Sequence, residues 1–479
     1  MILSPAGIIV TCLIALCGGF LGSSMIVGLL ISIAFGATAI GALPMLGGSS
    51  PQVFTVFAMA LIIMSILHPG SARYLLHILR RHWTIPAMLL LGMYAAAGAF
   101  ALPRLFAGEA SAFIPVAGRI YEAPLSPVSG NISQTLYFLI GVLSFVGMTA
   151  WLCRTGEWRI MKIALLAFAA TNGALGLVDI LAKLSGITDV LAPVRTANYA
   201  LLTTAIEASF WRISGGHSEA SAFAQAALSA WGVAFCYWRA TGSKIALASA
   251  CLNGLLILFS TSSTAYMAMF VLTAAGAMHL AARIASGRIP LRDARVAGAV
   301  AIGMFTVILA WVATPQFFEP ILNLIDNMLL RKTSSASGVE RAYWNIQGLS
   351  AVTATWGLGI GFGSSRASSW IVATISQLGI PGAIAISVII VALAREAGLA
   401  ERAASKSALK ERVGLAAAAR GGALASILGS SISGASADPG ILVFLCLAII
   451  VAMRVSQTAT DDRNGMRRVP SVRFRFRPA

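Results

Sequence analysis

The sequence predicts an all-α, polytopic integral membrane protein with about 12–14 transmembrane helices. Hydrophobic residues make up 58% of its 479 positions, and charged residues make up only 11%. Soluble domains average about 45–50% apolar and about 25% charged residues, so this composition excludes an ordinary soluble protein. The mean hydropathy is +0.84. The apolar residues also come in long runs separated by short polar segments, as membrane spans do.

The individual spans follow from the apolar runs. A transmembrane helix needs about 20 predominantly apolar residues. About thirteen runs approach this length, and the shorter ones can cross if their amphipathic flanks extend them. The first run lacks a small-residue cleavage site after it, so it is expected to be retained. The expected spans are Ile8–Phe20, Met25–Met45, Gln52–Leu67, Thr84–Leu102, Ile132–Leu152, Ile160–Leu181, Ser218–Tyr237, Ile245–Phe259, Ala265–Ala282, Val296–Val312, Trp370–Ala394, Gly414–Ile432 and Gly440–Met453.

Basic residues gather in one set of alternate loops, around Arg80, Arg159, Arg239 and Arg288 and within Arg395–Arg412. The positive-inside rule places such loops in the cytoplasm. Neighbouring basic loops are separated by two expected spans, so the assignment is consistent along the chain. The net charge of +17 therefore reflects membrane topology, and nucleic acid is not an expected partner.

This orientation divides the chain into a membrane domain, residues 1–455, and a basic cytoplasmic tail, residues 456–479. Membrane lipids are the expected partners of the whole domain. Charged side chains are costly near a bilayer and commonly mark a substrate site. Function is therefore expected in two of the outer loops, where arginines occur close to the membrane. The larger outer loops are 103–131, 182–217 and 313–369.

The second outer loop carries groups that suit an anion. Arg195 and Arg212 are followed by Gly215–Gly216, where the backbone can turn tightly. The next span begins directly afterwards, with Ser218 or Ser221 as its N-cap. A helix N-terminus binds anions, and guanidinium groups match the oxygens of phosphates. Together these features favour a phosphate site, for example for a lipid-linked diphosphate.

Two residues of this segment are candidate proton acceptors. His217 and Glu219 lie beside the expected phosphate site, and transfer of a glycosyl group to a hydroxyl is helped by a general base. The sequence leaves the choice between them open. The outer carboxylates are not paired at D-x-D spacing, and one histidine does not make a metal site. Neither a metal nor another cofactor is expected.

The third outer loop carries Arg341 and, further on, Arg366, with Gly357, Gly359 and Gly361 between them. Glycines two residues apart do not form a G-x-x-x-G helix-pairing face. They predict an irregular or re-entrant stretch, which is tolerated at membrane depth only inside protein or beside a wet cavity. The two arginines are candidates for stabilising a diphosphate leaving group.

Taken together, the motifs of the two loops resemble the O-antigen ligase and polysaccharide polymerase superfamily of bacterial inner-membrane proteins. The resemblance covers most of the chain in its topology. The residues that carry it are Arg212-x-x-Gly215-x-x-x-Glu219-x-Ser221, Arg341-x-x-Trp344, Gly357-x-Gly359-x-Gly361 with Arg366, and Leu378-Gly-Ile-Pro-Gly382.

The resemblance implies transfer of a glycan from an undecaprenyl-diphosphate carrier, outside the cytoplasmic membrane and without a nucleotide sugar. The expected activity is polymerisation of carrier-linked repeats into exopolysaccharide, capsule or O-antigen. A flippase and a chain-length regulator are the expected protein partners. Glu219, His217 and Arg341 are the expected catalytic residues. The expected substrate-binding residues are Arg195, Arg212, Gly215, Ser221, Trp344, Gly359, Gly361 and Arg366.

The sequence departs from the family pattern in two places. Ala220–Ser221 stands where members often carry Pro or Asn. Ligases often place a histidine in the last large outer loop, and 313–369 has none, which favours a polymerase over the alternative of a ligase. A flippase or transporter is the alternative from another class. Such proteins need ionisable groups within spans, and Asp179 is the clearest one here.

Overall fold

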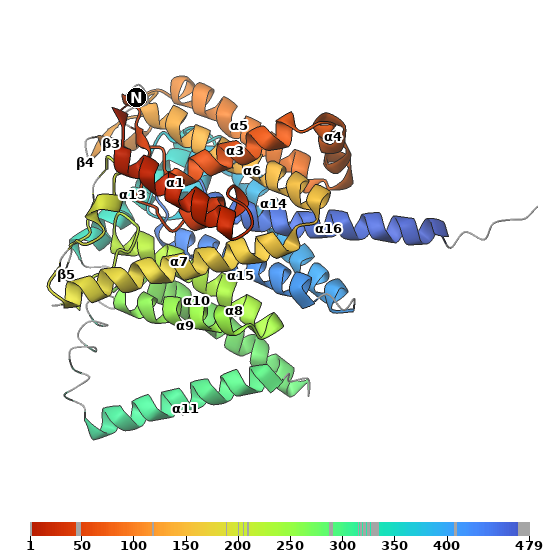
Figure 1. Ribbon diagram of the computed structural model, residues 1–479. Coiled ribbons are helices and arrows are strands. Elements are labelled where there is room, and N and C mark those ends of the chain that lie inside the picture. The colour runs from red at the N-terminus through yellow and green to blue at the C-terminus, as the bar shows by residue number, and fades with distance from the viewer. Residues whose placement is uncertain are drawn as a thin grey trace, which may run out of the picture.

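The protein is a bundle of helices with short two-stranded sheets gathered at one end (Figure 1). Residues 468–479, the last part of the expected tail, lie outside the residues that the computed structural model describes. Those residues are 2–44, 49–116, 119–187, 189–199, 201–204, 206–207, 210–286, 291–314, 335–406 and 410–467, and singly 316, 319, 322 and 326.

Each expected span overlaps a helix, although the run Met25–Met45 is helical only over Ile26–Ser32, and two further helices, α4 and α13, lie outside the expected spans. The helices are α1 (Pro5–Phe20), α2 (Ile26–Ser32), α3 (Val53–Leu67), α4 (Ser71–Arg81), α5 (Thr84–Leu105), α6 (Ser129–Thr155), α7 (Trp158–Leu184), α8 (Ala220–Thr241), α9 (Lys244–Phe259), α10 (Ser263–Ala285), α11 (Leu291–Ala313), α13 (Ala336–Ala354), α14 (Trp370–Lys406), α15 (Lys410–Ser433) and α16 (Ile441–Arg467).

Seven helices in the described part of the chain are long and apolar enough to cross a membrane, namely α5, α6, α7, α10, α11, α14 and α15. An eighth span results if α3 and α4, which meet at a bend of 102°, count as one. Among the remaining helices, α1, α9 and the start of α16 are apolar but shorter. The helix α2 has only 7 residues, which is too short to cross a membrane. The protein is thus a polytopic helical membrane protein, with fewer full-length spans than the expected 12–14, which was about one per apolar run.

The centre of the bundle is the first half of α16, in which every residue from Ile441 to Met453 is buried. Beside it, α8 and α15 approach closely. A Cβ atom at Gly232 of α8 would lie 2.6 Å from the carbonyl oxygen of Gly421 in α15. Small residues at such contacts let membrane helices gain packing where no hydrophobic force drives them together. This contact fixes the start of α8 next to the end of α15.

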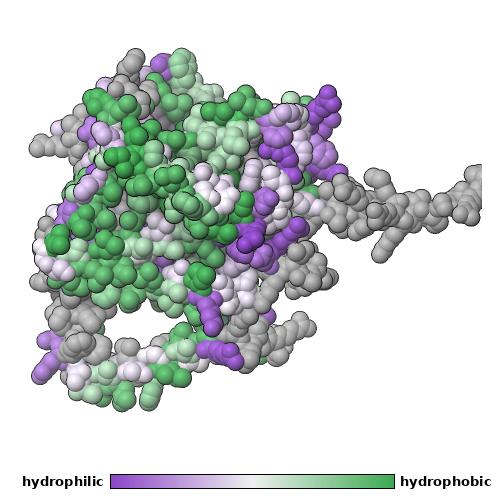
Figure 2. Space-filling model, viewed as in Figure 1, coloured by the Kyte–Doolittle hydropathy of each residue, from purple (hydrophilic) through white to green (hydrophobic). Residues whose placement is uncertain are grey.

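The two ends of the bundle differ in composition. The basic end carries the arginines at the end of α4, α8 and α10, with Arg154 at the end of α6 and Arg159 at the start of α7. Figure 2 shows hydrophilic side chains at that end and a broad apolar surface beside them. The opposite end, here called the loop end, carries residues 355–369, residues 434–440 and the short sheets. Their strands are β1 (Ile2–Leu3) with β2 (Gly41–Ala42), β3 (Ser111–Val116) with β4 (Arg119–Pro124), and β5 (Ile206–Glu207) with β6 (Phe210–Trp211).

Near its start α14 is broken, because Gly379 has a φ of +67° and Pro381 follows it. The segment 355–363 runs along this break. The amide of Ile360 donates to the carbonyl of Ser376 (2.8 Å), and the amide of Gly361 donates to that of Gln377 (3.1 Å). The irregular backbone predicted from the glycine spacing is therefore confirmed, and it is buried against protein.

The helix α11 stands apart from the rest of the bundle (Figure 1), and no described residue in its most apolar 18-residue stretch is buried. Its first turn is tied down by Asp293, which accepts two hydrogen bonds from Arg239 of α8, at 2.7 and 2.8 Å. Arg283 of α10 donates to the same carboxylate at 3.1 Å. These ion pairs anchor α11 at the basic end and leave its apolar side chains for lipid.

Candidate functional site

The two loops predicted to be functional meet at the loop end, where α8, α13 and α15 converge. Arg341 of α13 donates from Nη1 to the hydroxyl of Ser433 (3.1 Å), the last residue of α15. Gln225, in the second turn of α8, donates to the carbonyl of Ser433 (3.1 Å). Ser369 donates to the carbonyl of Ser431 (2.7 Å). The end of α15 thus joins elements that are far apart in the sequence.

Arg366 is held in place by aromatic packing and by a strand. Its Cζ lies 5.1 Å from the ring centroid of Trp344, which is buried, and this is a cation–π contact. Its backbone amide donates to the carbonyl of Phe113 in β3 (3.0 Å). The Phe113 ring in turn lies 6.3 Å from that of Trp344. The hairpin β3–β4 therefore braces both the tryptophan and the arginine.

The guanidinium of Arg366 is short of partners. Within the described residues its Nε is buried and has no hydrogen-bond partner. Burial lowers the pKa of Arg366 from its usual value, the carboxylate of Glu219 opposes this shift, and the cation of Arg341 adds to it. Two cations, Arg341 and Arg366, and two carboxylates, Glu219 and Glu340, therefore lie within electrostatic range at this end. A buried cation with an unused donor is suited to bind an anion, because pairing would offset its desolvation.

Glu219 is the N-cap of α8, with an extended backbone (φ −154°, ψ 163°). The start of this helix thus differs from the expected N-caps. Ser218 is held instead by the chain before it, because its carbonyl accepts from the amide of Leu202 (2.7 Å). Ser221 donates its hydroxyl to the Glu219 carboxylate. The carboxylate is partly exposed at the loop end, so it remains accessible to a substrate hydroxyl.

His217, the other candidate base, is buried. A Cβ atom on Gly36 would lie 2.3 Å from its Nδ1, which shows how tightly the ring is packed. Within the described residues its Nε2 has no hydrogen-bond partner. Burial, with a smaller effect of the Arg195 cation, lowers the pKa of His217 to about 4. The ring is therefore neutral at pH 7 and a weak base, whereas Glu219 lies at the surface of the site.

Arg195 belongs to a buried ion network that shapes the second loop. Its Nη2 donates to Asp179 of α7 (3.1 Å), and its Nη1 pairs with Asp189. Lys183 donates to Asp179 from one helical turn away (3.0 Å). Asp179 also accepts from the amides of Ser214 (2.8 Å) and Gly215 (3.1 Å). Arg195 as a substrate ligand stays a prediction, but its guanidinium is already committed to two carboxylates.

The three predicted glycines, Gly215, Gly359 and Gly361, have backbone conformations that favour glycine. Gly215 has a φ of +48°, and a Cβ atom there would lie 2.6 Å from the ring of Phe223. Gly359 and Gly361 also have positive φ, and a Cβ at Gly359 would lie 2.5 Å from the amide of Gly379. Only glycine fits such positions. Their role as substrate contacts stays a prediction.

Arg212 lies on the α10 side of the second loop. Its carbonyl accepts a hydrogen bond from Lys183 (2.7 Å), and its guanidinium acts electrostatically on Tyr266 in α10. Glu219, Ser221, Arg341, Trp344 and Arg366 form the candidate site, and Arg212 as a substrate ligand stays a prediction.

Asp438 is a carboxylate of the loop end that the sequence analysis did not consider. It lies between α15 and α16, in the segment Ser433-Gly-Ala-Ser-Ala-Asp-Pro-Gly440. The segment packs against the start of α14, where Trp370 donates from Nε1 to the carbonyl of Ala437 (2.9 Å). Burial raises the pKa of Asp438 to about 6, against the effect of the Gly440 amide. The signal in the sequence was a short polar segment between two apolar runs.

The raised pKa of Asp438 gives an expected pH dependence. The folded protein favours the protonated carboxyl, so this contribution to stability is complete below the ordinary pKa of 3.8. It is lost as the pH rises through about 6. The thermal unfolding midpoint of the wild type should therefore fall between pH 4 and pH 7, and Asp438→Asn should remove that component of the fall. Equal slopes for the two proteins in detergent would contradict this expectation.

Among the residues that the structure describes, no group of three or more His, Cys, Asp and Glu side chains is arranged to hold a metal ion. No protein-family model matches the chain, and no curated protein matches it significantly. The class that fold and composition define is that of a polytopic helical membrane protein. Any function has to be inferred from the arrangement of side chains at the loop end.

Proposed function

We propose that this chain polymerises oligosaccharide repeats that are linked to undecaprenyl diphosphate, at the outer face of a bacterial inner membrane. The observation that carries the proposal is the meeting of the two loops at Ser433, which contacts Arg341 of α13 and Gln225 near the start of α8, with Arg366 stacked on Trp344 of the same helix as Arg341. The motifs of these two loops resemble the O-antigen ligase and polysaccharide polymerase superfamily. A carboxylate at the start of α8 beside two arginines matches the needs of glycosyl transfer from a diphosphate.

The proposed reaction assigns one task to each group. A hydroxyl of the acceptor sugar attacks C1 of the donor glycan, and its proton passes to the carboxylate of Glu219. The bond between C1 and the diphosphate oxygen breaks as the new glycosidic bond forms. The carrier diphosphate leaves with an added negative charge, which Arg341 and Arg366 stabilise. Trp344 keeps the guanidinium of Arg366 in position.

The choice between a polymerase and its alternatives depends on the acceptor and on transport. A ligase would use the same site with a lipid or protein acceptor. A flippase would use ionisable groups within spans, and Asp179 is the clearest candidate. That carboxylate accepts hydrogen bonds from Lys183, Arg195 and two backbone amides. This commitment favours an enzyme over a transporter.

Reconstitution with carrier-linked repeats in excess chelator is the test of this proposal. The purified protein should build polymer without a nucleotide sugar or an added metal. Glu219→Gln should lower turnover by about 10²–10⁴-fold, the usual contribution of a general base. His217→Gln should be mild, because the ring is buried and its pKa is about 4.

The other outcomes have distinct meanings. Transfer to a non-carrier acceptor alone would make the protein a ligase, and movement of intact repeats across the bilayer without bond formation would make it a transporter. Activity that returns only with magnesium would remove the arginines from the role of sole charge stabilisers. A severe His217→Gln defect with a mild Glu219→Gln defect would transfer the role of base to His217.

A further inference from the structure

The helix α4 carries a concentrated positive charge at the basic end. Its arginines, Arg73, Arg80 and Arg81, are the first lysines or arginines of the chain, and no aspartate or glutamate occurs before Glu109. All three arginines are exposed. Figure 2 shows hydrophilic side chains where α4 lies in the same view of Figure 1. The segment that contains α4 therefore supplies positive charge without any acidic residue of its own.

The direction of α4 differs from that of the spans beside it. It meets α3 at a bend of 102°. The turn contains Pro69 and Gly70, with Gly70 at a φ of +77°, and Ser71 donates its hydroxyl to the carbonyl of Ile66 (2.5 Å). The bend is therefore fixed by the backbone. Because three arginines would be costly inside the bilayer, we place α4 along the membrane surface.

The helix has one face for protein and another for its surroundings. Ile78 is fully buried, and Tyr74 packs against the main core. On the exposed side, Arg73, His77 and Arg80 follow one another at spacings of four and three, which places them on one face of a helix. Within the described part of the chain, neither Arg73 nor Arg80 forms an ion pair. Both charges are therefore available to a partner outside the protein.

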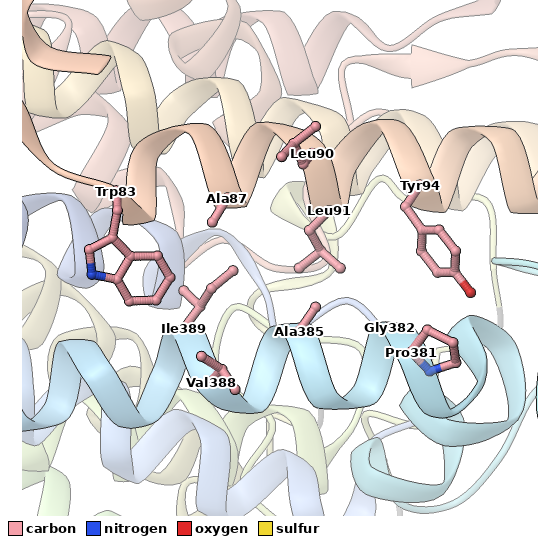
Figure 3. A pocket seen from close by; sticks show the side chains of 10 residues that line it. All are labelled: Trp83, Ala87, Leu90, Leu91, Tyr94, Pro381, Gly382, Ala385, Val388 and Ile389. Carbon is pink, nitrogen blue, oxygen red and sulfur yellow. The ribbon is translucent and has the colours of Figure 1, made fainter. Parts of the chain in front are cut away.

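Two large apolar side chains lie next to these arginines in the chain. Leu76 is 54% exposed and Trp83 is 50% exposed. Figure 3 shows the ring of Trp83 turned towards α14, at one end of the apolar groove between α5 and α14. Tryptophan is enriched at the level of lipid head groups, because its ring is apolar and its N–H is polar. The arginines and Trp83 thus mark a boundary between lipid tails and water.

The end of α4 is held against the bundle. The Nε2 atom of His82 lies 2.8 Å from a carboxylate oxygen of Glu396 in α14, and its Nδ1 lies 2.7 Å from the hydroxyl of Thr84. The His82 and Glu396 side chains are mostly buried. Arg154 at the end of α6 acts electrostatically on Tyr74, so it adds a further cation beside α4. These contacts keep the basic face in a fixed position.

We propose that α4 binds the phosphate head groups of anionic phospholipids, with Leu76 and Trp83 reaching the upper part of the acyl chains. Guanidinium groups match the oxygens of phosphates. An orientation signal needs only positive charge in a loop, whereas an interfacial helix presents a basic face with apolar side chains beside it, as α4 does. The inference is independent of the reaction proposed for the loop end.

Photo-crosslinking of the full-length protein tests this surface. The protein is placed in phosphatidylcholine nanodiscs that contain a trace of phosphatidylglycerol or phosphatidylcholine, each with a diazirine high on one acyl chain. The phosphatidylglycerol probe should label residues 68–85 in preference to the other probe. Arg80→Gln should lower this preference about fivefold, and Arg73→Gln combined with Arg80→Gln about 25-fold. Salt should weaken it, whereas inorganic phosphate at equal ionic strength should not compete.

Arg104→Gln is the matched control. Arg104 is an exposed arginine in the last turn of α5, at the loop end, so its replacement should leave the labelling of residues 68–85 unchanged. The unfolding midpoints of all variants should match that of the wild type, because the replaced side chains are exposed. Arg73→Gln alone takes the place of the double variant if that protein is unstable.

Three results would overturn the proposal. Equal labelling by the two probes in the wild type, or an unchanged preference in the folded double variant, would leave the arginines of α4 as orientation signals. Displacement of the phosphatidylglycerol probe by inorganic phosphate would make the surface a site for a free anion. Because the protein is purified and folded before the lipid is added, a change of orientation during membrane insertion does not affect the outcome.

Discussion

Replacing Arg366 with alanine should abolish polymer formation without unfolding the protein. The guanidinium stacks on Trp344 and lies near both Arg341 and Glu219. If it stabilises the leaving diphosphate, its loss should lower turnover by about 10²–10³-fold, as removal of one donor to a developing anion does. Arg341→Ala should have an effect of similar size. The measurement is the initial rate of chain extension with carrier-linked repeats.

Stability should move in the opposite direction, and this separates a functional role from a structural one. The pKa of Arg366 is lowered mainly by burial, which means that its protein partners do not fully offset the cost of desolvating the guanidinium. Removing the cation should leave the unfolding midpoint unchanged or raise it. A large fall in the midpoint, with activity lost in proportion, would instead assign Arg366 to the scaffold.

Two further variants sharpen the test. Arg366→Lys keeps the charge but loses the planar fork and its stacking, so it should restore activity only in small part. Arg104, at the end of α5, is an exposed arginine that donates to the carbonyl of Phe100 in its own helix. Arg104→Ala should retain activity within about twofold, since exposed pairs contribute little. Full activity of Arg366→Ala would remove this arginine from the mechanism.

The positions of the spans were predictable because a bilayer offers no hydrogen-bond partner to backbone amides and carbonyls. An apolar run that crosses it must therefore satisfy them internally as a helix. The runs around Thr84–Leu105 and Ser129–Thr155 were found within a few residues for this reason. Helix length was less predictable. The run from Met25 forms only the helix Ile26–Ser32, since hydropathy does not record where the chain turns inside protein.

The residues of the candidate site could be named from the sequence, but their arrangement could not. Arg341, Arg366 and Glu219 follow from motif spacing, whereas their proximity depends on packing at Ser433 between distant helices. Asp438 was missed because its segment is short and carries no motif. The ion pair of Arg195 with Asp179 could not be predicted, since sequence spacing does not show that the loop returns this side chain to α7.

The largest effect on folding is expected from Asp179→Ala. The side chains of Asp179, Lys183 and Arg195 are each about 1% exposed. Removing the shared carboxylate leaves two buried cations poorly compensated and frees the amides of Ser214 and Gly215. Breaking a buried ion pair in this way costs roughly 3–5 kcal/mol. The variant should be nearly absent from the membrane, or its loop before α8 should become sensitive to protease.

Controls show whether charge balance is the cause. Asp189, whose side chain is 30% exposed, contacts the same Arg195, and Asp189→Asn should be much milder because solvent screens that pair. Combining Asp179→Leu with Lys183→Met should recover part of the protein that Asp179→Leu alone loses, since one buried charge leaves with its partner.

A transporter that uses Asp179 as a proton carrier would behave differently, because Asp179→Asn would then fold normally and lose only transport. Asp179→Ala protein with a wild-type unfolding midpoint would show that the network does not hold the loop, and that Glu219 is positioned by the start of α8 alone.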